Sequence, residues 1–218
     1  MLCRRQLGGR SRRPKSRELD RCPMAQSRRY RLLELRLGQL RRRLLPKAFS
    51  PIGYYNDIQL DRARGYRLLA HAEIEAFLEE RASEVVTRVF NLWLNDRKPR
   101  HTVVCLLAHF RPGEKSFATV AEAVGFCFGK FNQTIKDNNG IKQENLQKFL
   151  PPVGIDWALM DGTWLSTLNS FGTARGEVAH SSVRVHQPID PMGEYDTVSN
   201  KILPGLKDLD SAMQVLLK

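Results

Sequence analysis

The sequence predicts an all-α protein in which one long helix and several shorter helices form a bundle. From residue 61 to about residue 95 the chain contains no proline and repeats apolar residues at spacings of three, four and seven. Shorter segments at 27–45, 116–136 and 196–217 show the same periodicity, and prolines or turn-forming residues lie between them. Because an α-helix turns once in about 3.6 residues, this spacing gathers apolar side chains on one face that can be buried. Segments of this kind pack as helices around a shared core.

Residues 27–45 are expected to form the first helix. Its leucines recur at helical spacing with arginines on the other faces, at Leu33, Leu37, Leu40 and Leu44. This pattern indicates an amphipathic helix packed on the body, in preference to a helix lying on a membrane surface. Pro46 ends the helix, and residues 46–60 are expected to form a loop. The long helix that follows, from Asp61 to about Asn95, buries Tyr66, Ala70, Ile74, Phe77, Leu78, Val85, Val89 and Leu92.

The middle of the chain contains one segment that fits two structures. Residues 101–110, HTVVCLLAHF, are apolar with β-branched residues at the front, so a buried strand and a short helix both fit. The sequence RPG at 111–113 indicates a turn. Residues 116–136 are expected to form a helix, which the turn sequence DNNG at 137–140 ends. Its apolar residues are Phe117, Val120, Val124, Cys127, Phe128 and Phe131.

The last third of the chain is expected to contain three helices. A short helix at 141–150 stops at Pro151 and Pro152. Asp156 can cap the next helix through its side-chain oxygen. The apolar face of that helix consists of Met160, Trp164, Leu168, Phe171 and Val178. After His180 the chain is expected to loosen through Pro188, Pro191 and Gly193, before a final helix at about 196–217. The final helix carries Val198, Ile202, Leu206, Leu209, Met213 and Leu216.

The charge of the protein is concentrated at its N-terminal end. The whole chain has 35 basic and 23 acidic residues, and residues 1–43 hold 15 of the basic and 3 of the acidic ones. Residues 1–26 are Arg-rich with few large apolar side chains, which predicts a disordered arm. The arm has no apolar core of a secretory signal. Two interpretations stay open: an extension upstream of a start at Met24, or a basic arm that attracts nucleic acid.

Several classes of protein are disfavoured by what the sequence lacks. No run of 18 apolar residues is present, so no transmembrane helix is expected. The four cysteines form no CxxC pair, which disfavours zinc, and Cys105 and Cys127 are expected to be reduced core residues of a cytoplasmic protein. The motifs GxGxxG, GxxxxGK[ST], HExxH and GxSxG are missing, so no cofactor or metal is expected.

Three polar residues of the long helix, His71, Glu73 and Glu75, have side chains that can bind a metal ion. Successive residues of a helix are rotated by about 100°, so His71 and Glu75 share a face while Glu73 points about 200° away. Three ligands from this stretch therefore cannot converge on one ion. The expected arrangement is a hydrogen-bonded pair of His71 and Glu75 on the helix surface.

Arg175 and His180 form the most informative pair in the sequence. Arg175 continues the apolar stripe of its helix, and a guanidinium is costly to bury without a partner. We therefore expect that end of the stripe to face a cleft or another subunit. His180 lies about 140° round the helix from Arg175, so the two share a site only if the last turn distorts near Gly172 and Gly176 or if a second chain contributes. An Arg and a His suffice for metal-free RNA cleavage; a structural Arg with a surface His is the alternative.

The segment FGTARGEVAH, which contains both residues, resembles the signature of HEPN domains, which are all-α bundles marked by an Arg, four to six residues and a His. The segment GYRLLAHAEIEAFLEERASEVV resembles the long helix of the RiboL-PSP-HEPN-like branch, as does the tail from Pro188 through LKDLDSAMQVLL. The resemblance covers most of residues 27–217 and implies a HEPN-like domain at 27–218 after the arm at 1–26.

The resemblance implies a metal-independent endoribonuclease that works as a homodimer, with Arg175 and His180 of both protomers lining one cleft. Many members have Asn or Asp where this chain has Gly176. His71, Glu73 and Glu75 match a recurrent block of the branch and are expected to have supporting roles.

Family analogy further implies a role in phage defence, in a toxin–antitoxin pair or in a stress response, with RNA as a partner and an antitoxin or other regulator as a second one. No membrane partner is expected. The alternatives are a non-catalytic HEPN module that binds RNA or a partner protein, and a structural helical bundle with no nucleic-acid role. Retention of both Arg175 and His180 favours the enzyme.

Overall fold

The computed structural model describes residues 25–110, 116–180 and 188–217, and at 178–180 it describes the backbone alone. These residues form helices, turns and loops with no strand, so the all-α prediction is confirmed. The flexible arm predicted at 1–26 lies outside the described residues except for its last two. Among the described helices, none combines the length and the apolar character needed to cross a bilayer.

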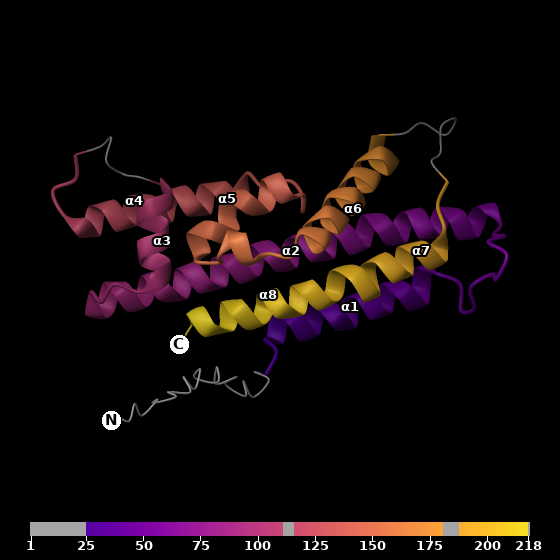
Figure 1. Ribbon diagram of the computed structural model, residues 1–218, viewed down its shortest axis with the longest axis horizontal. Coiled ribbons are helices and arrows are strands. Elements are labelled where there is room, and N and C mark those ends of the chain that lie inside the picture. The colour runs from indigo at the N-terminus through magenta and orange to yellow at the C-terminus, as the bar shows by residue number, and fades with distance from the viewer. Residues whose placement is uncertain (1–24, 111–115, 181–187, 218) are drawn as a thin grey trace, which may run out of the picture.

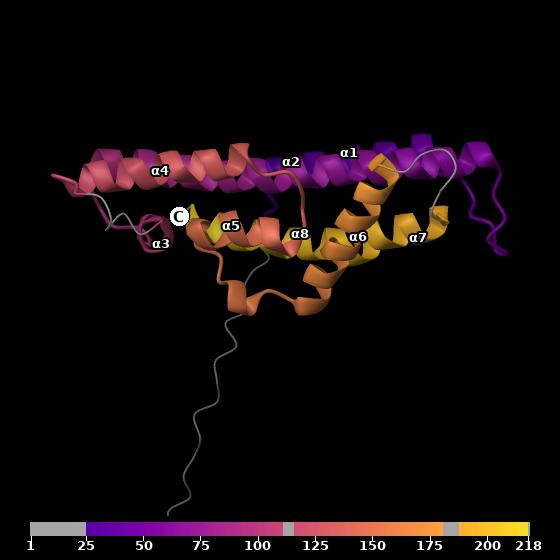
Figure 2. The same ribbon diagram turned by 90° about the horizontal axis from the view of Figure 1, so that it is seen from above.

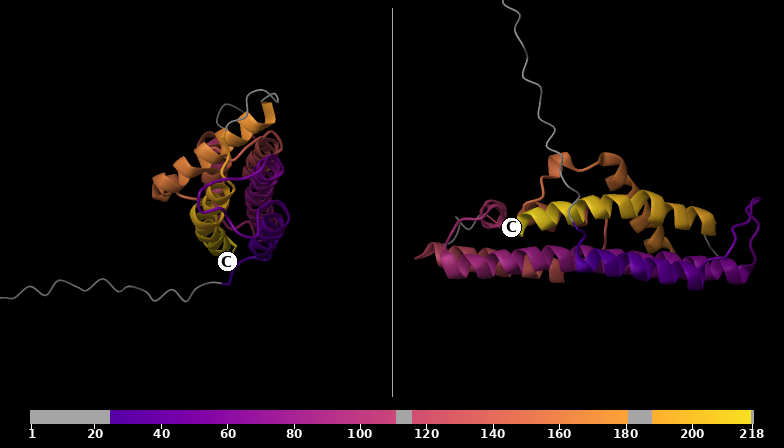
Figure 3. Two further views of the ribbon diagram at one scale, coloured as in Figure 1. Left: turned by 90° about the vertical axis from the view of Figure 1, so that its right-hand side faces the viewer. Right: turned by 90° about the horizontal axis from the view of Figure 1, so that it is seen from below.

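The long helix α2 (Asp57–Asp96) runs the length of the molecule and organises the other helices (Figure 1). Helices α1 (Arg28–Leu44) and α4 (Val120–Lys136) lie in the same layer as α2, while α3 (His101–Phe110), α5 (Gln143–Val153) and α8 (Leu203–Leu216) form a second layer (Figure 2). Figure 3 shows α8 lying against α1 and α2. Helix α6 (Gly162–His180) crosses between the layers beside α7 (Pro191–Asp196), over the N-terminal half of α2.

The ends of the first two helices follow from their local sequence. The Ser27 hydroxyl accepts a hydrogen bond from the backbone N–H of Tyr30 at 3.0 Å and caps α1. A reciprocal capping box between Asn56 and Gln59 starts α2, four residues before the predicted start. Helix α2 ends at Arg97, whose φ of 58° is left-handed. The first helix and the long helix are thus confirmed.

The structure decides or corrects three further elements. Residues 101–110, which fitted either type, form a helix. The prediction that the next short helix stops at Pro151 and Pro152 is wrong, because α5 continues to Val153 and ends at Gly154 with φ 108°. Two prolines are tolerated there because the carbonyls that lose an amide partner belong to Gln147 and Lys148, which are exposed to water. Asp156 caps only the short 3₁₀ turn η2 (Trp157–Leu159), and α6 begins after it, at Gly162.

The chain does not loosen through Pro191 and Gly193, contrary to prediction. The carboxylate of Asp190 accepts hydrogen bonds from the backbone N–H groups of Met192 and Gly193 at 3.1 and 2.9 Å, and Pro191 occupies the first turn of α7. The predicted final helix is divided into a π-helical segment, η3 (Thr197–Ile202), followed by α8. Pro204 has no N–H and crowds the carbonyl four residues before it, which favours a wider helical turn at this point.

Most of the predicted apolar stripes are buried, and they meet in one core. Along α2 the predicted stripe is buried except for Leu92, which is half-buried, while Trp93 is buried in its place. In α4, Val120 is 67% exposed, contrary to prediction. Both cysteines inside the described residues are free; Cys127 is buried as predicted, and Cys105 is only half-buried. Burial raises the pKa of both thiols.

A buried ion pair that the sequence did not reveal joins α2 to α8. The Arg81 Nε donates to Asp210 Oδ1 at 2.8 Å, and both residues are fully buried. The second oxygen of Asp210 accepts a hydrogen bond from the backbone N–H of Ser27 at 2.8 Å. This one carboxylate therefore joins α8, α2 and the start of α1.

Helices α6 and α8 approach closely where Trp164 packs against Gly205. A Cβ added at Gly205 would lie 2.3 Å from Trp164 Nε1, which also donates to the Ile202 carbonyl at 3.0 Å. We expect Gly205→Ala to lower the free energy of unfolding by about 1–3 kcal/mol, because the indole cannot move without losing its bond. Urea denaturation checks this. Gly65→Ala is the control, since beyond the adjoining backbone no described atom lies within 4 Å of its added Cβ, and a similar loss there would contradict the explanation.

Candidate functional site

Arg175 lies half-buried on α6 where that helix crosses α2, next to His71. The rings of Phe171 and His71 stack with centroids 6.1 Å apart and an angle of 26° between their planes. A Cβ added at Gly172 would lie 3.8 Å from His71 Nε2. One turn of α6 therefore covers His71, and Arg175 follows on the next turn.

His71 is buried, with an exposed fraction of only 2%. Its Nδ1 lies 3.5 Å from the nearer carboxylate oxygen of Glu75, but the geometry is not that of a hydrogen bond and the nitrogen has no hydrogen-bond partner among the described residues. The expected hydrogen-bonded pair on the helix surface is therefore wrong in both respects. The reason is tertiary, because α6 packs over the face of α2 that carries His71.

Glu73 points to another part of the molecule. It accepts a hydrogen bond from the Arg36 Nε of α1 at 2.8 Å. This confirms the geometric prediction that Glu73 and the His71–Glu75 face of the helix diverge. Glu73 therefore does not join the group of residues around Arg175.

The charge of Arg175 affects the pKa of both His71 and Glu75 at the α2–α6 crossing. Burial and, secondly, the positive charge of Arg175 lower the pKa of His71 to about 4. Burial and the negative charge of Glu79 raise the pKa of Glu75, and Arg175 opposes that change. His71 is consequently uncharged at neutral pH, and Arg175 is a cation beside a buried imidazole and a carboxylate.

Lys142 is a second basic residue at the crossing that the sequence analysis missed. A Cβ added at Gly172 would lie 3.0 Å from Lys142 Cγ and 3.7 Å from its Cε, so the lysine stem lies across Gly172. The backbone N–H of Gln143 donates to Asn169 Oδ1 at 2.7 Å, which holds the start of α5 against α6. The only sequence signal was Gly172, whose missing side chain makes room for this contact.

The described backbone of α6 is helical throughout from Arg175 to His180, its last residue. A distortion near Gly172 and Gly176, the first of the two routes to a shared site, is therefore not observed. Five residues of regular helix separate the directions of the two side chains by about 140°. The side chain of His180 lies outside what the structure describes. Of the two routes to a shared site, the contribution of a second chain is the one that stays open.

The arrangement provides a half-exposed guanidinium at the end of an otherwise buried stripe, with Trp164, Leu168 and Phe171 buried before it. A guanidinium offers donors in a planar fork that suits a phosphate. The neutral imidazole of His71 adds no negative charge beside Arg175, and Glu75 is the carboxylate whose charge interacts with it from α2. The donors of the guanidinium that these groups leave free are suited to stabilising negative charge on a bound anion.

The low pKa of His71 predicts a pH-dependent stability. The unfolded chain protonates His71 below about pH 6.5, while the folded protein resists protonation until about pH 4. This contribution to stability is complete above the unfolded pKa and is lost as the pH falls toward 4. We expect the free energy of unfolding to fall by about 2 kcal/mol between pH 7.5 and pH 5, because the unfolded chain takes up a proton at His71 that the folded protein does not. Urea denaturation of wild type and His71→Gln at both pH values isolates it, since other histidines contribute equally to both proteins. Equal pH dependence would contradict the assignment.

Comparison with known protein families gives a match over most of the chain. The family model described as RiboL-PSP-HEPN matches residues 43–213, which include α2, α6 and every residue of the α2–α6 crossing. Neither the curated proteins nor the solved structures give a significant match.

Proposed function

This chain belongs to the RiboL-PSP-HEPN family, and on that basis we propose that it is a metal-independent endoribonuclease with Arg175 and His180 as its catalytic pair. Membership in a HEPN family supports a nuclease or RNA-binding module in general. The observation that carries the finer proposal is the half-exposed Arg175 at the end of a buried stripe, followed by His180 at the end of the same helix.

The proposed reaction requires no metal. His180 removes the proton from a ribose 2′-hydroxyl, whose oxygen attacks the adjacent phosphorus while the bond from phosphorus to the 5′-oxygen breaks. The leaving 5′-oxygen takes up a proton from water, His180 later releases its proton to water, and the products carry a 2′,3′-cyclic phosphate and a 5′-hydroxyl. Arg175 stabilises the charge that develops on the non-bridging oxygens. His71, with a pKa of about 4, is a poor acid–base group near neutral pH and has the supporting role of packing beside Arg175.

The regular helix between Arg175 and His180 supports a site built from two protomers. Because the two side chains leave α6 in directions about 140° apart, one protomer alone does not bring them to the same phosphate. In the proposed homodimer, Arg175 of one protomer acts with His180 of the partner subunit. Family analogy further suggests a role in phage defence, a toxin–antitoxin pair or a stress response, under the control of a regulatory partner.

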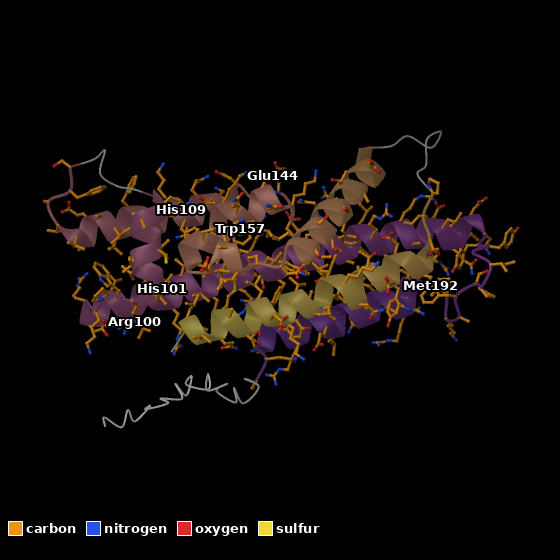
Figure 4. The ribbon with its side chains drawn as sticks, viewed as in Figure 1. Arg100, His101, His109, Glu144, Trp157 and Met192 are labelled. Atoms are coloured by element: carbon orange, nitrogen blue, oxygen red, sulfur yellow. The ribbon has the colours of Figure 1, made fainter. Side chains whose placement is uncertain are left out.

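Incubation of the purified protein with total RNA and with tRNA in EDTA tests this proposal. We expect fragments that resist EDTA, carry 2′,3′-cyclic phosphates, and disappear with Arg175→Ala and with His180→Ala. Arg100→Ala and His109→Ala are matched controls because they change the same residue types away from the candidate site. Figure 4 shows both residues at the α3 end of the molecule, and Met192 of α7, a helix close to the candidate site, at the opposite end. Binding of RNA by a folded dimer without cleavage would instead indicate the non-catalytic module.

A further inference from the structure

Arg67 is a buried arginine of α2 whose three guanidinium nitrogens all have partners. Its Nε donates to Glu194 Oε2 at 2.9 Å, and its Nη2 donates to Glu194 Oε1 at 2.5 Å. Its Nη1 donates to the backbone carbonyl of Ala174 at 3.4 Å. Both Arg67 and Glu194 are only 8% exposed. We call this group of three residues the Arg67 clamp.

The Arg67 clamp joins α2, α6 and α7 next to the candidate site. Ala174 directly precedes Arg175, and Glu194 lies on α7, the first helix that the structure describes after α6. His71 lies one helical turn after Arg67 on α2 and packs against Phe171. Two side chains of α2, one turn apart, therefore contact α6 on successive turns, at 171 and at 174. This double contact sets the rotation of α6 about its own axis and so the direction in which Arg175 leaves it.

Stability alone does not account for a group of this kind. Replacing a buried ion pair by apolar residues of similar size is often neutral or stabilising, because two charges must be removed from water. What the charged pair adds is geometry, since both oxygens of Glu194 hold the guanidinium plane in one orientation. The third nitrogen of Arg67 then contacts one particular carbonyl of α6.

We infer that Arg67, held by Glu194, is a positioning residue that orients Arg175 for the RNA cleavage proposed above. The inference rests on that proposed function for its effect on the reaction. Arg67 itself does not touch the reacting groups. Its geometric part, the orientation of Arg175 over His71, can be measured without RNA.

The protein contains a matched control. Arg81 is a second buried arginine of α2 and pairs with Asp210 of α8, as Arg67 pairs with Glu194. Arg81 lies 14 residues after Arg67, or about 21 Å along the helix, and its hydrogen bonds within the described part of the chain go to Asp210 and Glu84. Both arginines support the fold, but only Arg67 adjoins Arg175.

The first measurement is the kinetics of cleavage of one tRNA transcript at a temperature where circular dichroism shows every variant folded. Lysine keeps the positive charge but cannot make the two-pronged contact, so Arg67→Lys is expected to lower kcat by about 10- to 100-fold with KM within about twofold. Glu194→Gln is expected to change kcat in the same direction. Arg81→Lys is expected to lower thermal stability and to leave kcat within about twofold. Equal losses of kcat in Arg67→Lys and Arg81→Lys would show a merely structural role and overturn the inference.

The second measurement is the pKa of His71, followed by NMR through its ring protons. His71 lies near Glu75 on its own helix and Arg175 on α6, and burial together with Arg175 lowers its pKa to about 4. The Arg175→Gln variant gives the pKa of His71 in the absence of the guanidinium. Arg67→Lys is expected to shift the pKa of His71 toward that reference value, and Arg81→Lys to leave it unchanged. A His71 titration in Arg67→Lys identical to that of wild type would overturn the inference.

These two readouts separate the inference from the proposed function. If the wild-type protein cleaves no RNA, the proposed endoribonuclease fails, while the titration of His71 still decides whether Arg67 orients Arg175. If the wild-type protein cleaves RNA and neither readout responds to Arg67→Lys, only the positioning role fails.

Discussion

His180→Ala is expected to lower the rate of RNA cleavage by about 10²- to 10⁴-fold, the range for loss of a general acid–base group. Arg175→Ala is expected to cost about 10²- to 10³-fold, because charge on the phosphate oxygens then lacks its stabilising donor. Initial rates of cleavage of one tRNA transcript measure both effects. Since His180 is the last residue of α6 and Arg175 is only half-buried, we expect both variants to stay folded and to form the proposed dimer as the wild type does. A His180→Ala protein that cleaves at the wild-type rate would refute the assigned chemistry.

Mixing the two inactive variants tests whether the site is shared between protomers. In a dimer of one Arg175→Ala chain and one His180→Ala chain, one of the two composite sites retains both catalytic groups, and the other retains neither. Random exchange of protomers in an equal mixture is therefore expected to restore about a quarter of the wild-type activity. If Arg175 and His180 act within one protomer, the mixture remains inactive. Gel filtration with light scattering, run beforehand, establishes that the variants form dimers and that they exchange.

Asp210→Ala is expected to lower the free energy of unfolding by about 3–5 kcal/mol, the range for removal of one partner of a buried ion pair. Asp210 is fully buried and accepts hydrogen bonds from Arg81 Nε and from the backbone N–H of Ser27. Its loss leaves the Arg81 guanidinium buried, with Glu84 as its remaining hydrogen-bond partner. Urea denaturation at pH 7 measures the effect.

Asp208→Ala is the matched control for this prediction, because Asp208 is an exposed carboxylate on the same helix, two residues away. Its removal is expected to change the free energy of unfolding by no more than about 0.5 kcal/mol. A double variant, Arg81→Met with Asp210→Leu, is expected to recover much of the stability that Asp210→Ala loses, because apolar residues need no charged partner. An Asp210→Ala protein as stable as Asp208→Ala would show that the buried pair contributes little.

The sequence alone determined the helical class of the described chain, and the reason is that helical periodicity is local. The leucines of α1 and the stripe of α2 lie three or four residues apart, so their burial follows from helix geometry alone. The same local rule separated Glu73 from His71 and marked Arg175 as an exception in an apolar stripe. The resemblance carried by these segments is confirmed by the family match over residues 43–213.

Only the tertiary structure decided what surrounds those residues. His71 was expected on a surface and is buried, because α6, about a hundred residues later in the chain, crosses over it. The buried carboxylate partners of Arg67 and Arg81, Glu194 and Asp210, lie 127 and 129 residues away, a separation at which sequence spacing carries no geometric information. The rule that proline ends a helix fails at Pro151 because the carbonyls without an amide partner belong to exposed residues of α5. The rule that proline marks a loop fails at Pro191 because Asp190 caps the start of α7 there. Periodicity predicts which face of a helix is buried, and the packing of distant helices decides which groups meet there.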